Sequence, residues 1–125
     1  MHCVAVIVSK EKLSDPEIYS IMKPFDEYDF YGQYYDPVTD EYEDIPEEAY
    51  PEFTYDYFSV EETKPFNSEE IDQSYTVISE NGEAASRTRW NGNKYEDHRG
   101  KYNELVDRLR SDPSNKWMTI IDYHY

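Results

Sequence analysis

The charge of this chain is concentrated in one continuous segment, which limits how the rest can fold. Residues 26–72 contain 17 Asp and Glu and one basic residue, Lys64, whereas the remainder contains 11 acidic and 11 basic residues. The net charge of −16 therefore belongs to this window alone. Because like charges repel one another in a compact chain, other interactions have to hold the window in place. We expect a neutral domain that carries an acidic insert over residues 26–72.

The same acidic window is rich in aromatic residues. It contains eight Tyr and four Phe, although acidic segments that remain disordered usually have few aromatics. We therefore expect most of the window to be ordered, with its rings packed on the domain and its carboxylates in solvent; a disordered window is the open alternative. Residues 30–45, FYGQYYDPVTDEYEDI, predict a hairpin whose turn begins at Asp36-Pro37.

The segment before the window predicts a strand and a helix. Residues 3–9, CVAVIVS, form an apolar run without alternation, which is typical of a central strand covered on at least one face, and we expect cover on both. Ser14 and Glu17 have the spacing of a capping box at a helix start, and Pro24 marks the helix end. The apolar stripe of this helix consists of Ile18, Ile21, Met22 and Phe25.

The segment after the window predicts a hairpin, a second helix and a last strand. Asn81-Gly82 separates two strand-like runs. Residues 101–113 have an amphipathic pattern, and residues 116–125 form an apolar strand. The resulting α+β order, β-α-β-β-α-β with the insert after the first helix, is that of a ferredoxin-like split βαβ fold with both helices on one face. Other strand orders stay open because the insert can add strands.

The length of the chain, 125 residues, predicts a single domain over residues 1–125. One cysteine, Cys3, excludes an internal disulfide. Neither a leader pattern at the start nor an apolar run long enough to cross a membrane is present in the sequence. We expect a cytoplasmic protein without a membrane association.

Motifs for catalysis or metal binding are missing from the sequence. The stretch DPVTDEYED lacks the spacing and the glycine of a calcium loop. The chain has four glycines and no Gly-rich phosphate loop, and its Cys and His residues do not have zinc spacing. Cys3 beside His2 is interpreted as an apolar residue of a buried strand. We therefore expect no cofactor, no metal site and no enzymatic activity.

A short basic segment is the exception to the acidic character. Residues 86–101 contain Arg87 and Arg89 together with Trp90 and Tyr95. Such a mixture can form a nucleic-acid patch, but the net charge opposes direct nucleic-acid binding. We expect these arginines to pair with the acidic insert of the same molecule.

The acidic insert is then the best candidate for a binding surface. Alternate residues of a strand lie about 6.6 Å apart on one face, and successive phosphates of a DNA strand advance about 3.4 Å along the axis. Carboxylates displayed in this way suit a basic nucleic-acid groove, and tyrosines supply contact area. A solvated acidic surface without a partner is the alternative. The candidate partner-binding residues are Asp40, Glu41, Tyr42, Glu43, Asp44, Glu47, Glu48, Tyr50, Tyr55, Asp56 and Tyr57.

Parts of the chain resemble a group of phage proteins. The start, VAVIVSKEKLSDPEIYSIMKPFDEY, resembles small uncharacterised acidic accessory proteins of bacteriophages and prophages, in which a strand and a short helix end in a PFDE motif. Residues 87–92, RTRWNG, are similar to their Gly-Gly-Arg-Trp segment but lack the paired glycines, and KWMTIIDYHY is similar to their last strand. The resemblance implies a phage-borne gene acting in the bacterial host cytoplasm, among proteins that resemble inhibitors of host defence nucleases.

We therefore expect a non-enzymatic inhibitor of a basic nucleic-acid-binding host protein, a CRISPR or restriction effector, that acts as an acidic nucleic-acid mimic. A second interpretation is a small enzyme or a sequestering protein for an anionic nucleotide, with Arg87, Arg89 and His98 facing the ligand. A third is a phage assembly accessory protein. The sequence leaves these three open.

Overall fold

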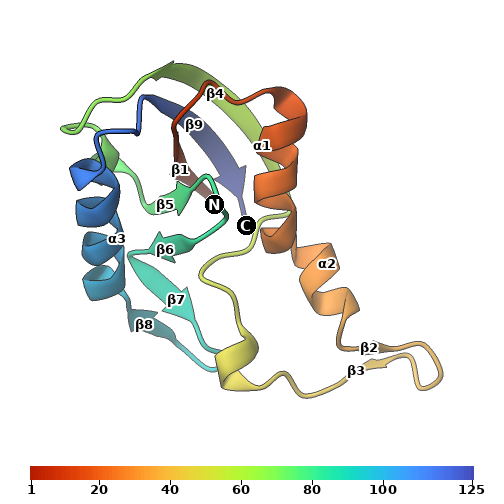
Figure 1. Ribbon diagram of the computed structural model, residues 1–125. Helices are drawn as coiled ribbons and strands as arrows, with labels where there is room; N and C mark the ends of the chain where they lie inside the picture. Colours follow the sequence, from red (N-terminus) through yellow and green to blue (C-terminus); the bar gives the residue numbers. More distant parts are fainter.

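A five-stranded mixed sheet forms the centre of the protein in a computed structural model that describes residues 1–125 (Figure 1). The order across the sheet is β4 (Tyr57–Pro65), β9 (Trp117–His124), β1 (His2–Ser9), β5 (Thr76–Ser79) and β6 (Ala84–Ser86). β1 is parallel to β5 and antiparallel to β9. The mixture of helices with a mixed sheet confirms the predicted α+β class.

Strand β1 is buried on both of its faces, as its apolar sequence predicts. Ala5 and Ile7 belong to the core on one side of the sheet, and Val6 and Val8 belong to the core on the other side. All four side chains are almost completely inaccessible to solvent. Because successive residues of a strand point to opposite faces, this pattern requires a cover on each side.

Helix α1 (Asp15–Met22) covers the first of these faces. Its start has the predicted capping box, in which the Ser14 hydroxyl oxygen accepts from the Glu17 amide and the Glu17 carboxylate accepts from the Ser14 amide. The helix changes to a 3₁₀ turn over Lys23–Phe25, at the predicted proline. Ile18 and Met22 of the helix and Phe25 of the turn pack against Ala5 and Ile7.

Helix α3 (Arg99–Ser111) covers the opposite face of the sheet. Its four predicted apolar residues, Tyr102, Leu105, Val106 and Leu109, are buried in the core that contains Val6 and Val8. The prediction that both helices share one face is therefore wrong. The physical reason is the unbroken apolar run of β1, whose two faces each need a helix as cover.

The strand order also differs from a split βαβ fold. In that arrangement another strand separates the two strands that the first helix connects, whereas here β1 pairs directly with β5. The acidic insert adds β4 as an edge strand beside β9. The ferredoxin-like order is thus not confirmed, and the insert contributes the additional strand that the sequence left open.

The remaining part of the insert forms a helix and a hairpin. Helix α2 (Glu27–Gly32) leads into strands β2 (Tyr35–Asp36) and β3 (Glu41–Tyr42), which confirm the hairpin predicted for residues 30–45. This hairpin projects from the body of the protein (Figure 1). Phe30, Phe53 and Tyr55 of the insert are buried, so its aromatic residues attach it to the domain.

A second small hairpin follows the central sheet. β5 and β6 are joined by the predicted Asn81-Gly82 turn, in which Gly82 has a φ of 90°. β7 (Thr88–Trp90) and β8 (Tyr95–Asp97) then pair with each other as a separate two-stranded sheet. None of the helices has the length and apolar character needed to cross a membrane.

Candidate functional site: an acidic arm and an aromatic pocket

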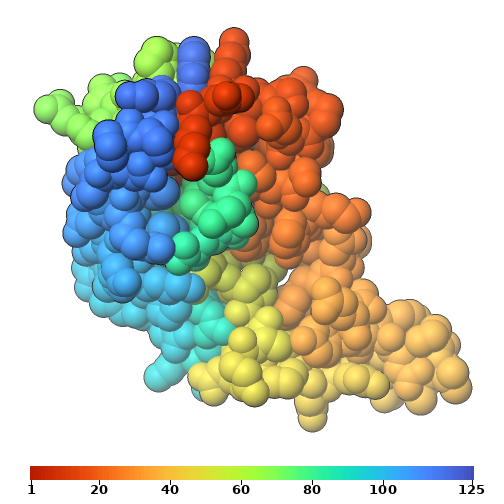
Figure 2. Space-filling model, in the orientation of Figure 1, coloured from red at the N-terminus to blue at the C-terminus, as the bar shows by residue number.

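Residues 33–49, which we call the acidic arm, carry the densest negative charge of the surface. The arm has no basic residue, and it projects at the lower right of Figure 2. Strand β3 covers only Glu41 and Tyr42, so the even spacing expected of an extended strand does not apply to the whole arm. Its carboxylates, all exposed except the half-buried Asp36, are Asp36, Asp40, Glu41, Glu43, Asp44, Glu47 and Glu48.

The turn of the acidic arm is fixed by its own side chains. The Asp36 carboxylate accepts from the Val38 amide at 2.9 Å, which closes the start of the turn. Asp40 has a φ of 56°, a left-handed conformation that Asp tolerates better than most residues. The Tyr35 hydroxyl donates to the Asp40 carboxylate, and this hydrogen bond raises the pKa of Tyr35. The tip is therefore shaped before any partner binds.

A chain of aromatic contacts joins the arm to helix α2. The rings of Tyr35 and Tyr42 lie 5.3 Å apart between centroids, and Tyr42 lies 6.2 Å from Tyr31. Tyr31 in turn contacts the buried Phe30 at 5.1 Å. Such tilted and edge-to-face pairs each add about 0.5–1.5 kcal/mol to the burial of the rings. The arm is therefore stiffened at its base, while Tyr42 remains 65% exposed.

Arg89 attaches the returning end of the arm to strand β7. Its Nη2 donates to the carbonyls of Tyr50 at 2.7 Å and Glu47 at 2.9 Å. Its Nη1 donates to the Glu96 carboxylate at 2.7 Å, and the side chain is 12% exposed. The expected pairing of Arg89 with carboxylates of the insert is wrong, because its carboxylate partner, Glu96, lies outside the insert and its contacts with the insert are to backbone carbonyls.

Arg87 is also occupied within the molecule. Its guanidinium donates to the carbonyls of Ser74 and Asp72 and lies 4.8 Å from the centre of the Tyr102 ring. His98 is bonded through Nδ1 to the Glu52 carboxylate at 3.0 Å. The three residues suggested for an anionic ligand are thus held by partners of the same chain.

Four of the candidate partner-binding residues lie outside the acidic arm, and the first of them, Tyr50, directly follows it. Tyr55 is 5% exposed and belongs to the core, so its assignment to the partner-binding surface is wrong. Asp56 accepts from His124 Nδ1 at 2.9 Å, and Tyr57 stacks on the His124 ring at 4.9 Å. Although burial opposes it, the hydrogen bond with His124 lowers the pKa of Asp56. Asp56 and Tyr57 therefore form a separate cluster with β9.

Glu27, at the start of helix α2, lies among other carboxylates. Burial raises its pKa, and the neighbouring charges of Asp56 and Asp26 raise it further. A raised carboxyl pKa means that the ionised form is disfavoured in the folded state. The effect of Glu27 on the stability of the fold is therefore most favourable below the ordinary carboxyl pKa, where the group is neutral. As the pH rises through the raised pKa, the group ionises and this advantage is lost.

The Glu27→Gln variant is accordingly expected to be more stable than the parent protein at pH 7. The gain should be below about 1 kcal/mol, the scale of partly exposed charges, and it should disappear near pH 4, where the parent residue is also neutral. Thermal unfolding across this pH range measures the difference. The Glu69→Gln variant removes an exposed carboxylate elsewhere and should show no such trend. Equal behaviour of the two variants would contradict the expectation.

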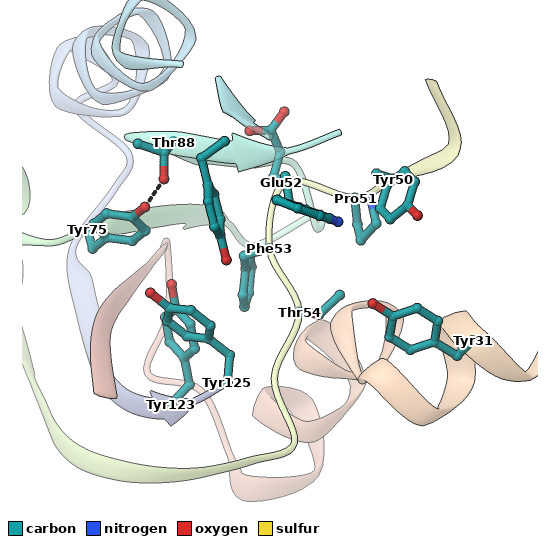
Figure 3. Close-up of a pocket in the computed structure, with 12 residues that line it drawn as sticks. Tyr31, Tyr50, Pro51, Glu52, Phe53, Thr54, Tyr75, Thr88, Tyr123 and Tyr125 are labelled. Carbon is teal, nitrogen blue, oxygen red and sulfur yellow. Dashed lines mark hydrogen bonds between the residues drawn. The ribbon is translucent and has the colours of Figure 1, made fainter. Parts of the chain in front are cut away.

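An aromatic pocket lies between the end of the arm, the β7–β8 hairpin and the end of β9 (Figure 3). Its enclosed volume is about 60 Å³, enough for a few water molecules or a small group. No single stretch of the sequence predicts this pocket, because its walls come from separate segments. The lining residues are Tyr31, Tyr50, Pro51, Glu52, Phe53, Thr54, Tyr75, Thr88, Trp90, Tyr95, Tyr123 and Tyr125.

The walls of this aromatic pocket are neutral. Burial raises the pKa of Tyr125 to about 12, and burial also raises the pKa values of Tyr31 and Tyr123. The Glu52 carboxylate turns away from the cavity in Figure 3, and its Oε1 accepts from Lys101 at 2.6 Å. The pocket therefore presents phenol rings and hydroxyls without a charge of its own.

Comparisons with known proteins add no family and no function to this description. No protein-family model, curated protein or solved structure matches the chain. The chemistry of the acidic arm and of the aromatic pocket therefore carries the functional argument.

Proposed function

We propose that this protein is a non-enzymatic inhibitor that binds a basic nucleic-acid-binding protein and occupies its nucleic-acid channel with the acidic arm. The observation that carries the proposal is the arm itself, which projects into solvent with seven carboxylates and no basic residue. The resemblance of the opening strand and helix to phage accessory proteins points to a host CRISPR or restriction effector as the partner, in the bacterial cytoplasm.

Electrostatics support this choice of partner. Carboxylates on one projecting hairpin produce a local negative field, which attracts a positively charged groove and accelerates encounter. The turn at Asp36 and Asp40 and the Tyr31–Tyr42 contact hold the hairpin before binding. A preformed arm loses little conformational entropy on binding. The hydrogen bonds and ring contacts of the hairpin offset the repulsion among its carboxylates.

Exposed apolar side chains on the arm and on α2 support a protein partner. Tyr42 is 65% exposed, Tyr28 is 74% exposed, and Val38 at the hairpin tip is 91% exposed. Tyrosines give a large contact area with few rotatable bonds and are frequent at interface hot spots. Carboxylates would thus promote encounter, and these side chains would slow dissociation.

The anionic-nucleotide alternative has less support. It requires Arg87, Arg89 and His98 to face a ligand, but these side chains donate to carbonyls and carboxylates of the same chain. A net charge of −16 also repels a nucleotide from the surface.

Capture from a bacterial lysate tests the proposed function. The immobilised protein is expected to retain a nucleic-acid-binding protein at low salt and to release it at high salt, because the screening length shortens with salt. Duplex DNA added as a competitor should displace the same protein, which mass spectrometry identifies. A partner without nucleic-acid-binding activity, or one that DNA does not displace, would contradict the proposal.

A further inference from the structure

The aromatic pocket lies beside the acidic arm and shares residues with its base. Tyr50 directly follows the arm and packs against Phe30 at 5.5 Å. Tyr31 lines the pocket and also contacts Tyr42 of the arm at 6.2 Å. A protein that engages the arm therefore also meets the mouth of the pocket.

The pocket walls suit a positively charged group. Six Tyr residues, Phe53 and Trp90 line the cavity, and no Lys, Arg or His does. Ring faces attract cations through their quadrupole, and the indole of Trp does so most strongly. Trp90 and Tyr95 lie 5.1 Å apart and are 37% and 58% exposed, so they are accessible at the surface. The acidic field of the chain favours a cation over an anion.

Free hydroxyls favour a guanidinium over an ammonium group. The hydroxyls of Tyr31, Tyr50 and Tyr95 make no hydrogen bond within the chain, whereas the hydroxyl of Tyr123 bonds to Thr76 at 2.8 Å. A guanidinium has five N–H donors, is weakly hydrated and stacks on rings. Within the same chain, the Arg87 guanidinium lies over the Tyr102 ring, 4.8 Å from its centre.

We propose that the aromatic pocket binds the guanidinium of an arginine side chain that belongs to the protein engaged by the acidic arm. This inference rests on the proposed function for the source of the arginine, because a basic nucleic-acid channel is lined with arginine and lysine. The arm attracts the basic surface, and the pocket selects one side chain of it by shape and ring contacts.

Methylguanidinium is the probe for the pocket. In a Trp117→Phe background, where Trp90 is the only tryptophan, its addition should change Trp90 fluorescence and reach saturation at millimolar concentration. About 0.5 M ionic strength, held constant with NaCl, reduces the screening length to roughly 4 Å and suppresses general charge attraction. Methylurea, a neutral group of nearly the same shape, should bind at least about tenfold more weakly. Equal binding of both probes would overturn the inference.

Matched variants locate the binding. Tyr95→Leu removes a ring from the pocket and should weaken methylguanidinium binding at least about threefold, whereas Tyr95→Phe keeps the ring and should lose less. Tyr28→Leu removes an exposed ring of α2 that does not line the pocket, and binding should be unchanged. Equal losses in the Tyr95→Leu and Tyr28→Leu variants would overturn the inference. In the parent protein, calorimetric titration of methylguanidinium and of methylurea makes the same comparison without any variant.

Partner binding separates this inference from the proposed function. Tyr95→Leu should lower the affinity for the captured partner. The salt dependence of that affinity should stay unchanged, because no charge is removed. Absence of methylguanidinium binding overturns the pocket inference alone. Unchanged partner affinity after removal of the arm carboxylates overturns the proposed function, and with it the source of the arginine.

Discussion

Replacement of Asp40, Glu41, Glu43 and Asp44 by Asn or Gln should weaken partner binding at least about 100-fold at low salt. The four side chains are exposed on the acidic arm and have no basic neighbour within it. If each carboxylate contributes about 0.7 kcal/mol to binding, the sum is close to 2.8 kcal/mol, or two orders of magnitude in affinity. Neutral amides of the same shape keep the fold of the hairpin, so the loss reports charge.

The salt dependence of binding distinguishes this effect from a general loss of charge. Titrations at several salt concentrations should give a flatter dependence for the arm variant, with most of the change in the association rate. The control carries the same charge change at the exposed Glu61, Glu69, Glu104 and Asp107 outside the arm. It should bind within about threefold of the parent protein, because distant exposed charges are screened. Equal losses in both variants would show that the arm has no special role.

Local sequence signals predicted the elements of the fold, and long-range contacts decided their arrangement. The Ser14–Glu17 capping box and the Asn81-Gly82 turn each depend on a few neighbouring residues, and both are present. The sides on which α1 and α3 pack depend on β1, which contacts residues far away in the sequence. The apolar run of β1 indicates that both faces of the strand are covered. The presence of two helices in the sequence does not by itself say that each face is covered by one of them.

For the candidate site too, the sequence predicts some features, such as the exposed carboxylates, but not the burial of individual tyrosines. Six of the seven arm carboxylates are exposed, because like charges without basic neighbours have no favourable burial, and Asp36 is half-buried. Tyr55 and Tyr57 lie two positions apart in the sequence, on either side of Asp56, and have similar neighbours. Tyr55 is nevertheless in the core, whereas Tyr57 is 55% exposed. Pairing with β9 begins at Tyr57, whereas Tyr55 bonds through its backbone to Phe25 and Glu27. Neither partner is near in sequence, so the difference has no local signal.

Replacement of Arg89 by Ala is expected to destabilise the protein by about 1–3 kcal/mol and to release the end of the acidic arm. The change removes the donor from the half-buried Tyr50 carbonyl, and also from the exposed Glu47 carbonyl and the partly exposed Glu96 carboxylate. Each unsatisfied buried group costs about 1–3 kcal/mol. Chemical denaturation measures the loss, and hydrogen exchange should show faster exchange of arm amides than of β1 amides.

The geometry of the guanidinium, more than its charge, should determine the size of this effect. Arg89→Lys keeps a positive charge but cannot reach both carbonyls and Glu96 with one planar group, so an intermediate loss is expected. Arg99→Ala removes an exposed arginine that pairs with Asp97 beside the same hairpin, and its cost should be much smaller than that of Arg89→Ala because solvent screens the pair. The hydrogen bond from Arg89 lowers the pKa of Glu96. This part of the stabilisation is present above the ordinary carboxyl pKa and is lost as the pH falls through the lowered value. The carbonyl contacts do not titrate, so a loss in Arg89→Ala that vanished entirely in acid would contradict their role as the anchor of the arm.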